Sequence, residues 1–377
     1  MGLFKKPERR SVALIDIGSA SVGGAFVHLE AFSPPTIYYT ARVPIELRDG
    51  ETCHEGMLRA LSVLSQTLIS HGAPILRETT GSARVDSVLA SVSAPWQQTK
   101  VLVASKEEAN PFTFTHGLMD ELVGKCEVPD SGKGRCHNSI IATILNGYDV
   151  ADPFGKKVKR ADLVILSSML EEKVSSDIER SLRKHFHAHD VSLTAFAPLS
   201  YAVVRDMFPH EKDYLIIDVE GEATDLAFVK RGLLADVASV PQGTNALLSA
   251  ISRSHTTITE GTTGVIDPNR NVKFADLVSR IEEQWLKGLE GALKDFSSRH
   301  ALPRTVFLLS EEESRGFLER VIDNNALHSL WLSDEPLSVV SLTPSHLAQY
   351  VKTRGAAEGD VFLAMMALYS DKTARRN

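Results

Sequence analysis

Apolar runs that end in an acidic turn occur twice in this chain of 377 residues, once near the start of each half. The first covers residues 12–18 and ends in Asp16-Ile17-Gly18, and the second covers residues 214–218 and ends in Asp218. Runs of this kind predict buried strands, because their side chains meet protein on both faces. Two further strands are expected after each run, at residues 23–30 and 36–43 and at residues 224–230 and 233–240. The repeated order of strand, turn and two strands predicts two related halves.

Helices are expected where apolar residues recur every three or four positions, as they do along residues 274–296. The other expected helices cover residues 53–70, 171–186, 314–322 and 360–369, and two more start near Pro198 and Gly243. Further strands are expected at residues 191–197 and 305–309.

Residues 84–168 have a different order of elements, which predicts a small α+β insert. Strands are expected at residues 85–92, 99–103, 137–145 and 161–169, a helix at residues 115–124 and a loop at residues 129–135. The chain is therefore interpreted as an α/β protein with a first lobe of residues 11–83 and 169–212, the insert of residues 84–168, and a second lobe of residues 213–371.

Composition narrows the classes of function. Hydrophobic residues make up 43% and charged residues 24%, as in ordinary globular proteins. The net charge of -7 argues against a general nucleic-acid binder, which needs a basic face. Cys53, Cys126 and Cys136 form no CxxC pair, so neither a disulfide framework nor a zinc knuckle is expected, and a cytoplasmic protein is predicted.

The first ten residues carry two apolar residues, Leu3 and Phe4, beside four cations. They lack the apolar core of a signal peptide, and no run in the chain has the roughly 18–20 apolar residues that span a bilayer. This tail could contact an anionic membrane weakly, or it is an ordinary frayed terminus.

The duplicated strand–Asp–turn–hairpin order resembles the two ribonuclease-H-like lobes of the actin, Hsp70 and sugar-kinase superfamily. Within it, the chain resembles the bacterial division protein FtsA most, with the pilus-assembly protein PilM as a close second. Asp16-Ile17-Gly18-Ser19-Ala20 is similar to the first phosphate motif and Asp218–Ala227 to the second. Ser192–Ala202 resembles the helix that connects the lobes. The insert and the segment Tyr148–Gly155 match the extra subdomain of FtsA-like proteins and the segment that leads out of it.

The resemblance implies an actin-like ATPase fold with ATP and Mg²⁺ between the lobes. The implied phosphate ligands of the first turn are Gly18, Ser19 and Ser21, and Asp16 is the implied metal ligand. Glycine suits such a turn because backbone N–H groups must approach the phosphate oxygens without an intervening Cβ. Asp16-Ile17-Gly18 also suits a merely structural tight turn. The second turn and the helix after it contribute Asp218, Gly221, Thr224 and Gly243.

Two motifs depart from the family pattern. The second turn carries Glu220 and Glu222 where glycines are expected, and each carboxylate would repel a phosphate at ~4 Å by about 1 kcal/mol in water or about 4 kcal/mol near a protein surface. The adenosine turn reads Ser310-Glu311-Glu312-Glu313, which is better explained as a helix start with Ser310 as its cap. The sequence therefore predicts weak or lost binding of ATP and Mg²⁺.

Two weaker patterns could bind ligands. His185, His187 and His189 alternate as metal ligands can, but they fall at a helix end where polar residues are common. Ser131-Gly132-Lys133-Gly134 lacks the spacing of a phosphate loop and is interpreted as an ordinary loop.

Three functions stay open. The first is an FtsA-like cytoskeletal scaffold for cell division, which self-associates or binds a partner and meets the inner face of the membrane; no C-terminal anchor follows the last helix, so tethering there is not expected. The second is a PilM-like adaptor that binds a peptide of a membrane protein. The third is an enzyme, either an ATPase or a phosphatase that uses Glu220 or Glu222 as its base.

Overall fold

Two sheets with the same strand order form the frame of the molecule. The computed structural model describes residues 9–126, 134–254, 272–323, 325–331 and 337–374. The first sheet has the order β15-β3-β2-β1-β4-β9 and the second has the order β12-β11-β10-β13-β14. In the first sheet, β1 pairs antiparallel with β2 and parallel with β4. In the second, β10 pairs antiparallel with β11 and parallel with β13. The predicted duplication into two related halves is confirmed.

The bounds of these strands lie close to those expected from the sequence. The first sheet consists of β1 (Arg9–Ile17), β2 (Ser21–Glu30), β3 (Thr36–Pro44), β4 (Ser87–Val92), β9 (Asp190–Ala195) and β15 (Lys352–Ala356). The second consists of β10 (Tyr214–Val219), β11 (Thr224–Lys230), β12 (Leu233–Val240), β13 (Thr305–Leu309) and β14 (Ser338–Ser341).

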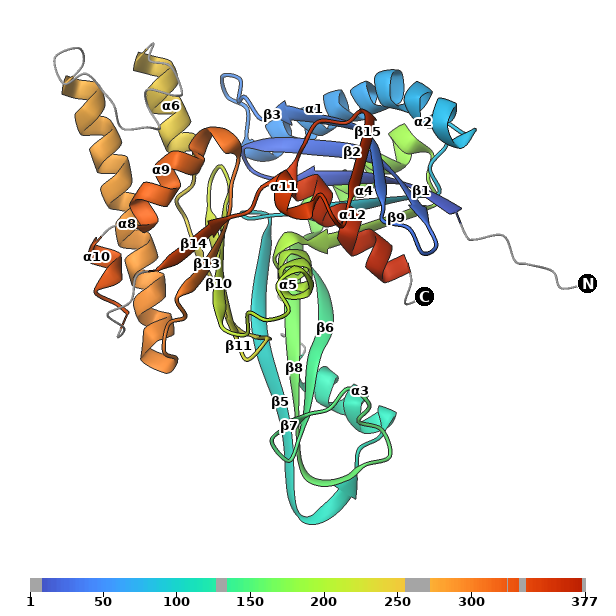
Figure 1. The fold of residues 1–377 in the computed structure, drawn as a ribbon, viewed down its shortest axis with the longest axis vertical. Helices are drawn as coiled ribbons and strands as arrows, with labels where there is room; N and C mark the ends of the chain where they lie inside the picture. The colour runs from blue at the N-terminus through green and yellow to red at the C-terminus, as the bar shows by residue number, and fades with distance from the viewer. Residues whose placement is uncertain (1–8, 127–133, 255–271, 324, 332–336, 375–377) are drawn as a thin grey trace, which may run out of the picture.

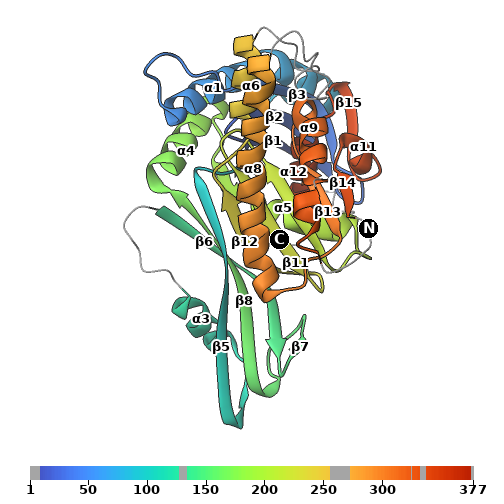
Figure 2. The same cartoon turned by 90° about the vertical axis from the view of Figure 1, so that its left-hand side faces the viewer.

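Helices cover both sheets in layers, as Figures 1 and 2 show. The outer face of the first sheet packs against α1 (Cys53–Thr67) and α4 (Glu172–Phe186), and that of the second against α8 (Val272–Arg299) and α9 (Glu312–Ile322). The middle layer consists of α5 (Phe196–Met207) and α12 (Val361–Ala374). The remaining helices of the two lobes, within the described residues, are α2 (Ala73–Thr80), preceded by a π-helical turn at Leu68–Gly72, α6 (Asn245–Ser254), α10 (Asn325–His328) and α11 (Pro344–Leu347).

The middle layer joins the two lobes through one apolar core. Leu14 of β1 and Ile216 of β10 belong to the same cluster as Leu199 of α5 and Met366 of α12, and all four are almost fully buried. Each fully buried aliphatic side chain contributes roughly 1.5–3 kcal/mol to folding. The relative position of the lobes is therefore fixed by burial, and the turns that end β1 and β10 are brought to the same cleft.

The insert projects away from both lobes (Figures 1 and 2). Its sheet has the order β5-β8-β6-β7, with α3 packed on one face. The elements are β5 (Gln97–Thr113), α3 (His116–Lys125), β6 (Gly134–Leu145), β7 (Tyr148–Asp149) and β8 (Lys157–Glu171).

Two segments lie in a different part of the fold from the one expected. Residues 85–92 were assigned to the insert, but β4 pairs with β1 and β9 in the middle of the first sheet. The closing helix was assigned to the second lobe, but α12 packs on β1, β2 and β3, and β15 pairs with β3. Both errors arise because an apolar pattern shows that a segment is buried and does not show against what.

None of the helices in the described part of the chain is long and apolar enough to cross a bilayer.

Candidate functional site

The two acidic turns face each other in the cleft between the lobes. Side chains alternate along a strand, so Asp16 shares a face of β1 with Leu14, and Asp218 shares a face of β10 with Ile216. Both faces belong to the core between the lobes, and Asp16 and Asp218 are 1% and 4% exposed. The predicted site residues at the ends of these strands are thus brought together by the pairing of the two halves.

A glutamate of the second turn occupies the first turn. The backbone N–H of Ser19 donates to Oε2 of Glu220 at 3.1 Å. A Cβ placed on Gly18 would lie 2.2 Å from the same oxygen, so glycine is required for this approach. The backbone N–H of Glu222 in turn donates to Oγ of Ser19 at 2.9 Å. The amide and hydroxyl groups of Ser19, which the resemblance implies as phosphate ligands, are therefore engaged by the facing turn.

The second turn is held from behind by the start of α6. The N–H groups of Thr244 and Asn245 donate to the carbonyl oxygens of Glu220 and Gly221, each at 2.9 Å. A Cβ on Gly221 would lie 2.6 Å from the backbone nitrogen of Ala20, so the two turns are in direct contact.

The other two predicted residues of this turn also contact protein. A Cβ on Gly243 would lie 2.2 Å from the carbonyl oxygen of Glu220, so this glycine permits the turn to pack on the segment before α6. The hydroxyl of Thr224 donates to the carbonyl oxygen of Gln242 at 2.8 Å and accepts from the indole N–H of Trp285 at 2.8 Å. Gly221, Thr224 and Gly243 therefore have clear structural roles.

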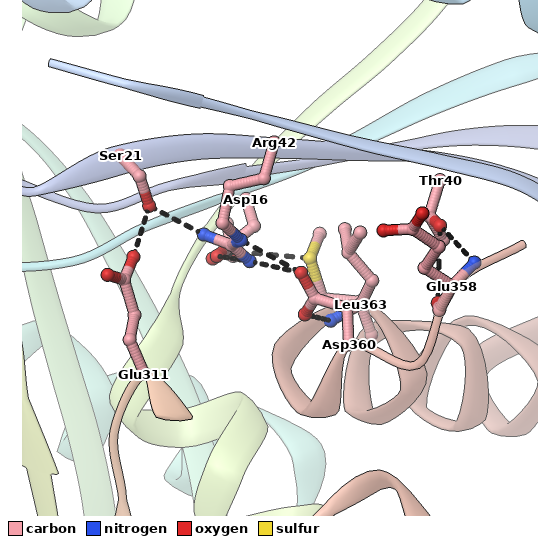
Figure 3. A network of polar contacts seen from close by, with 10 residues as sticks. Asp16, Ser21, Thr40, Arg42, Glu311, Glu358, Asp360 and Leu363 are labelled. Carbon is pink, nitrogen blue, oxygen red and sulfur yellow. Dashed lines mark hydrogen bonds and ion pairs between the residues drawn. The ribbon is translucent and has the colours of Figure 1, made fainter. Parts of the chain in front are cut away.

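Arg42 of β3 lies beside Asp16, the residue that the resemblance implies as a metal ligand (Figure 3). Its Nη2 donates to Asp16 at 3.0 Å, and its Nε donates at 2.8 Å to Asp360, which precedes α12. The hydroxyl of Ser91 donates to the other oxygen of Asp16 at 2.9 Å. Both oxygens of Asp16 therefore have protein partners.

The same guanidinium links the first lobe to the second. Nη1 of Arg42 donates to Oγ of Ser21 at 2.9 Å, and this hydroxyl donates to Oε1 of Glu311 at 2.6 Å (Figure 3). Glu311 stands immediately before α9 of the second lobe. The predicted ligand Ser21 is thus part of a bridge between the lobes.

Several carboxyl groups of the cleft lie near the guanidinium of Arg42. Burial, together with the nearby charges of Asp16 and Glu311, raises the pKa of Glu220 to about 8, although Arg42 opposes this shift. Burial also raises the pKa of Asp218 well above its ordinary value. At pH 7, which is below the pKa of about 8, Glu220 is therefore mainly protonated. Both glutamates that could serve as a phosphatase base have protein partners: Glu220 accepts from the N–H of Ser19 at 3.1 Å, and Glu222 accepts from the amide of Asn245 at 2.6 Å.

The acidic segment after β13 starts a helix, but its cap differs from the one expected. We expected Ser310 to be the N-cap; instead Glu311 holds this position, and no side chain accepts from the first turn of α9. Oγ of Ser310 is buried and has no hydrogen-bond partner among the described residues. Glu312 and Glu313 do lie in the first turn, where negative charge complements the helix dipole.

The histidines lie at the end of α4. His185 is in the last helical turn, where Nδ1 lies 2.8 Å from the carbonyl oxygen of Ser181, and His187 is the C-cap in the left-handed conformation. The described residues contain no cluster of three or more His, Cys, Asp or Glu that could bind a metal ion. Residues 131–133 of the glycine-rich loop lie outside the described residues.

Sequence reasoning missed three residues of this site: Arg42, Ser91 and Asp360. In each case a polar side chain interrupts or borders a segment that the sequence predicts to be a strand or an apolar helix. A buried charge needs a partner, so the two charged residues indicated that an ion pair was needed, but their spacing did not identify Asp16 as the partner.

Comparison with solved structures identifies the fold. No protein-family model matches the chain, and no curated protein matches it. A chain of the PilM–PilN type IV pilus biogenesis complex superposes with a TM-score of 0.62 at 15% identity, over 94% of this chain and 96% of that one. A protein of unknown function with an actin-like ATPase fold from Bacteroides thetaiotaomicron (8% identity, 96% of both chains, TM-score 0.42) is also similar. So is the ethanolamine utilization protein EutJ from Carboxydothermus hydrogenoformans (12% identity, 96% of this chain and 90% of that one, TM-score 0.41). The chain has an actin-like ATPase fold.

Proposed function

We propose that this actin-like protein works by assembling with other proteins, and that its own side chains hold the nucleotide cleft closed. The observation that carries the proposal is the Glu220 carboxyl group, which accepts from the N–H of Ser19 at 3.1 Å. The resemblance to actin-like ATPases implies that this N–H would donate to a phosphate oxygen of ATP, so the Glu220 carboxyl group substitutes for the phosphate.

The charges of the cleft support this interpretation. The guanidinium of Arg42 lies against Asp16, where a metal ion would be expected, and also contacts Asp360. A triphosphate that entered would have to displace Glu220, separate the turns at Gly221 and compete with the buried carboxyl groups of Asp16 and Asp218. Entry of a triphosphate would thus break the contact between Glu220 and the N–H of Ser19 and bring phosphate charge close to carboxyl groups, and both effects are unfavourable.

The similarity to the PilM chain of a pilus biogenesis complex favours a role of the pilus-adaptor type. We propose a scaffold at the cytoplasmic face of the membrane that binds a partner from such a machinery. An FtsA-like scaffold in cell division is the alternative, since both roles use the same fold with an insert in the first lobe. Purification of the tagged full chain from its native host separates the two, because the co-purifying proteins belong to a pilus or to a division machinery.

Titration calorimetry with Mg-ATP tests the closed cleft. We expect no heat of binding at millimolar nucleotide and no phosphate release. Binding in the micromolar range would refute the proposal. Denaturing the purified protein and analysing the supernatant for nucleotides controls for ATP that is carried through purification, and finding stoichiometric nucleotide would also refute it.

A further inference from the structure

A cavity lies beside the two acidic turns, at the junction of the two lobes and the insert. Its volume is about 530 Å³, within the range of ligand sites in proteins. Its floor is the inner face of the second sheet. There Asp218 of β10, Asp225 of β11 and Ser239 of β12 are neighbours across the three adjacent strands. Its walls include residues 97–100 at the start of β5 and Ala197 of α5. Apolar atoms form most of the lining.

Asp218 is the unsatisfied group of this cavity. The side chain is 96% buried, and its Oδ1 has no hydrogen-bond partner among the described residues. Asp225 differs, because it accepts from the amide of Gln97 at 2.9 Å and also bonds to Ser239. A buried acceptor without a partner is destabilising, so a ligand that supplies a donor to Asp218 would recover the lost hydrogen bond.

The charges around Asp218 favour a cation. Besides Asp225, the acidic groups that face it are Glu220 and Asp16, and Glu222 lines the same cavity. Lys100 is the one cation in the described lining. Burial and these neighbours hold the pKa of Asp218 well above its ordinary value.

We propose that this cavity binds an organic cation, an ammonium or guanidinium group on an apolar stem, which pairs with the carboxylate of Asp218. The apolar lining accepts the stem, and the acidic floor accepts the charge. The group comes either from a free amine or from a lysine or arginine side chain of a partner. The proposal goes beyond the assembly function and does not depend on whether ATP binds. A cation beside Asp218 lowers the raised pKa of this group, so binding is coupled to the release of protons and strengthens as pH rises.

Calorimetry with matched probes tests the site on the full-length protein. The free-amine arm compares hexylamine with hexanol, which has the same length and no charge. The peptide arm compares acetyl-Val-Lys-Val-amide with the norleucine analogue. Repeating each titration in two buffers of different ionisation enthalpy measures the protons released. Two variants complete the design: Asp218→Asn, which resembles the protonated acid and preserves the packing, and Asp276→Asn, which removes an exposed carboxylate of α8.

We expect the cationic probe of at least one arm to bind, with proton release, and its neutral analogue to bind at least tenfold more weakly. Asp218→Asn should weaken cation binding about tenfold or more, as expected for loss of a hydrogen bond to a charged group, and Asp276→Asn should leave it unchanged. Tighter binding in the peptide arm identifies a partner segment as the source, and tighter binding of hexylamine identifies a free amine. Equal affinity for charged and neutral probes, absence of binding in both arms, or wild-type affinity in Asp218→Asn would overturn the proposal.

Discussion

Replacement of Glu220 by glutamine gives the sharpest test of how the cleft is held closed. The substitution Glu220→Gln preserves the shape of the side chain and leaves an amide oxygen to accept from the N–H of Ser19, which now donates at 3.1 Å. It removes the ionisation of a group that is buried near Asp16 and Glu311. The variant should therefore fold in the same way and differ from the wild type in its response to pH.

The size of this difference follows from the pKa of Glu220. Its value is about 8 in the folded protein, against an ordinary value of 4.5, so between these two pH values the folded state binds a proton that the unfolded state releases. The contribution of this group to stability is therefore complete below about pH 4.5 and is lost as pH rises to about 8. Within the window, the free energy of unfolding should fall by about 1.4 kcal/mol per pH unit for this group, to a total of about 5 kcal/mol.

Urea denaturation at pH 5.5, 6.5 and 7.5 measures this slope. Raised pKa values at Asp218 and Asp225 contribute in the same direction in both proteins, so the relevant quantity is the difference between the two slopes. We expect the free energy of unfolding of Glu220→Gln to fall less steeply, by about 1.4 kcal/mol per pH unit. The matched control is Glu222→Gln, because Glu222 is a neighbouring exposed residue of the same turn, and its slope should equal that of the wild type. Equal slopes for Glu220→Gln and the wild type would show that the buried carboxyl group does not hold a proton in the folded protein.

Three further substitutions test other parts of the cleft. Arg42→Ala removes the partner of the buried Asp16 and of the partly buried Asp360 and should lower the free energy of unfolding by about 3–5 kcal/mol in urea, and a loss below 1 kcal/mol would contradict the ion-pair cluster. Gly221→Ala places a Cβ 2.6 Å from the backbone of Ala20 and should cost about 1–3 kcal/mol, whereas the same change at Gly316, which has open space around it, should cost nothing or stabilise α9 slightly; equal effects would rule out contact between the turns. Trp285→Phe loses the 2.8 Å bond to the Thr224 hydroxyl and should cost about 1–3 kcal/mol by thermal or urea unfolding, and an unchanged midpoint would exclude this bond as a support of the second turn.

The sequence by itself determined the duplicated frame. The two apolar runs that end in Asp16 and Asp218 were recognisable as buried strands, and each was followed by a hairpin in both the pattern and the structure. Local periodicity suffices here because a strand buried on both faces must be apolar throughout. The acidic character of the second turn was also evident from the sequence, because the residue types at a turn are known whatever lies across from it. The cofactor roles predicted for the site residues stay predictions.

Only the tertiary structure decided which groups meet in the cleft. Arg42 and Asp360 are 318 residues apart, and nothing in the spacing of either indicated that they form one cluster with Asp16. The same holds for β4 and α12, because their apolar residues predict burial against any apolar surface. Their positions are decided by the pairing of β4 with β1 and by the packing of α12 on the first sheet. Hydrophobic burial has no direction, whereas hydrogen bonds and ion pairs depend on distance and angle. The sequence could therefore predict the frame, and the fold had to bring together the charges that fill its cleft.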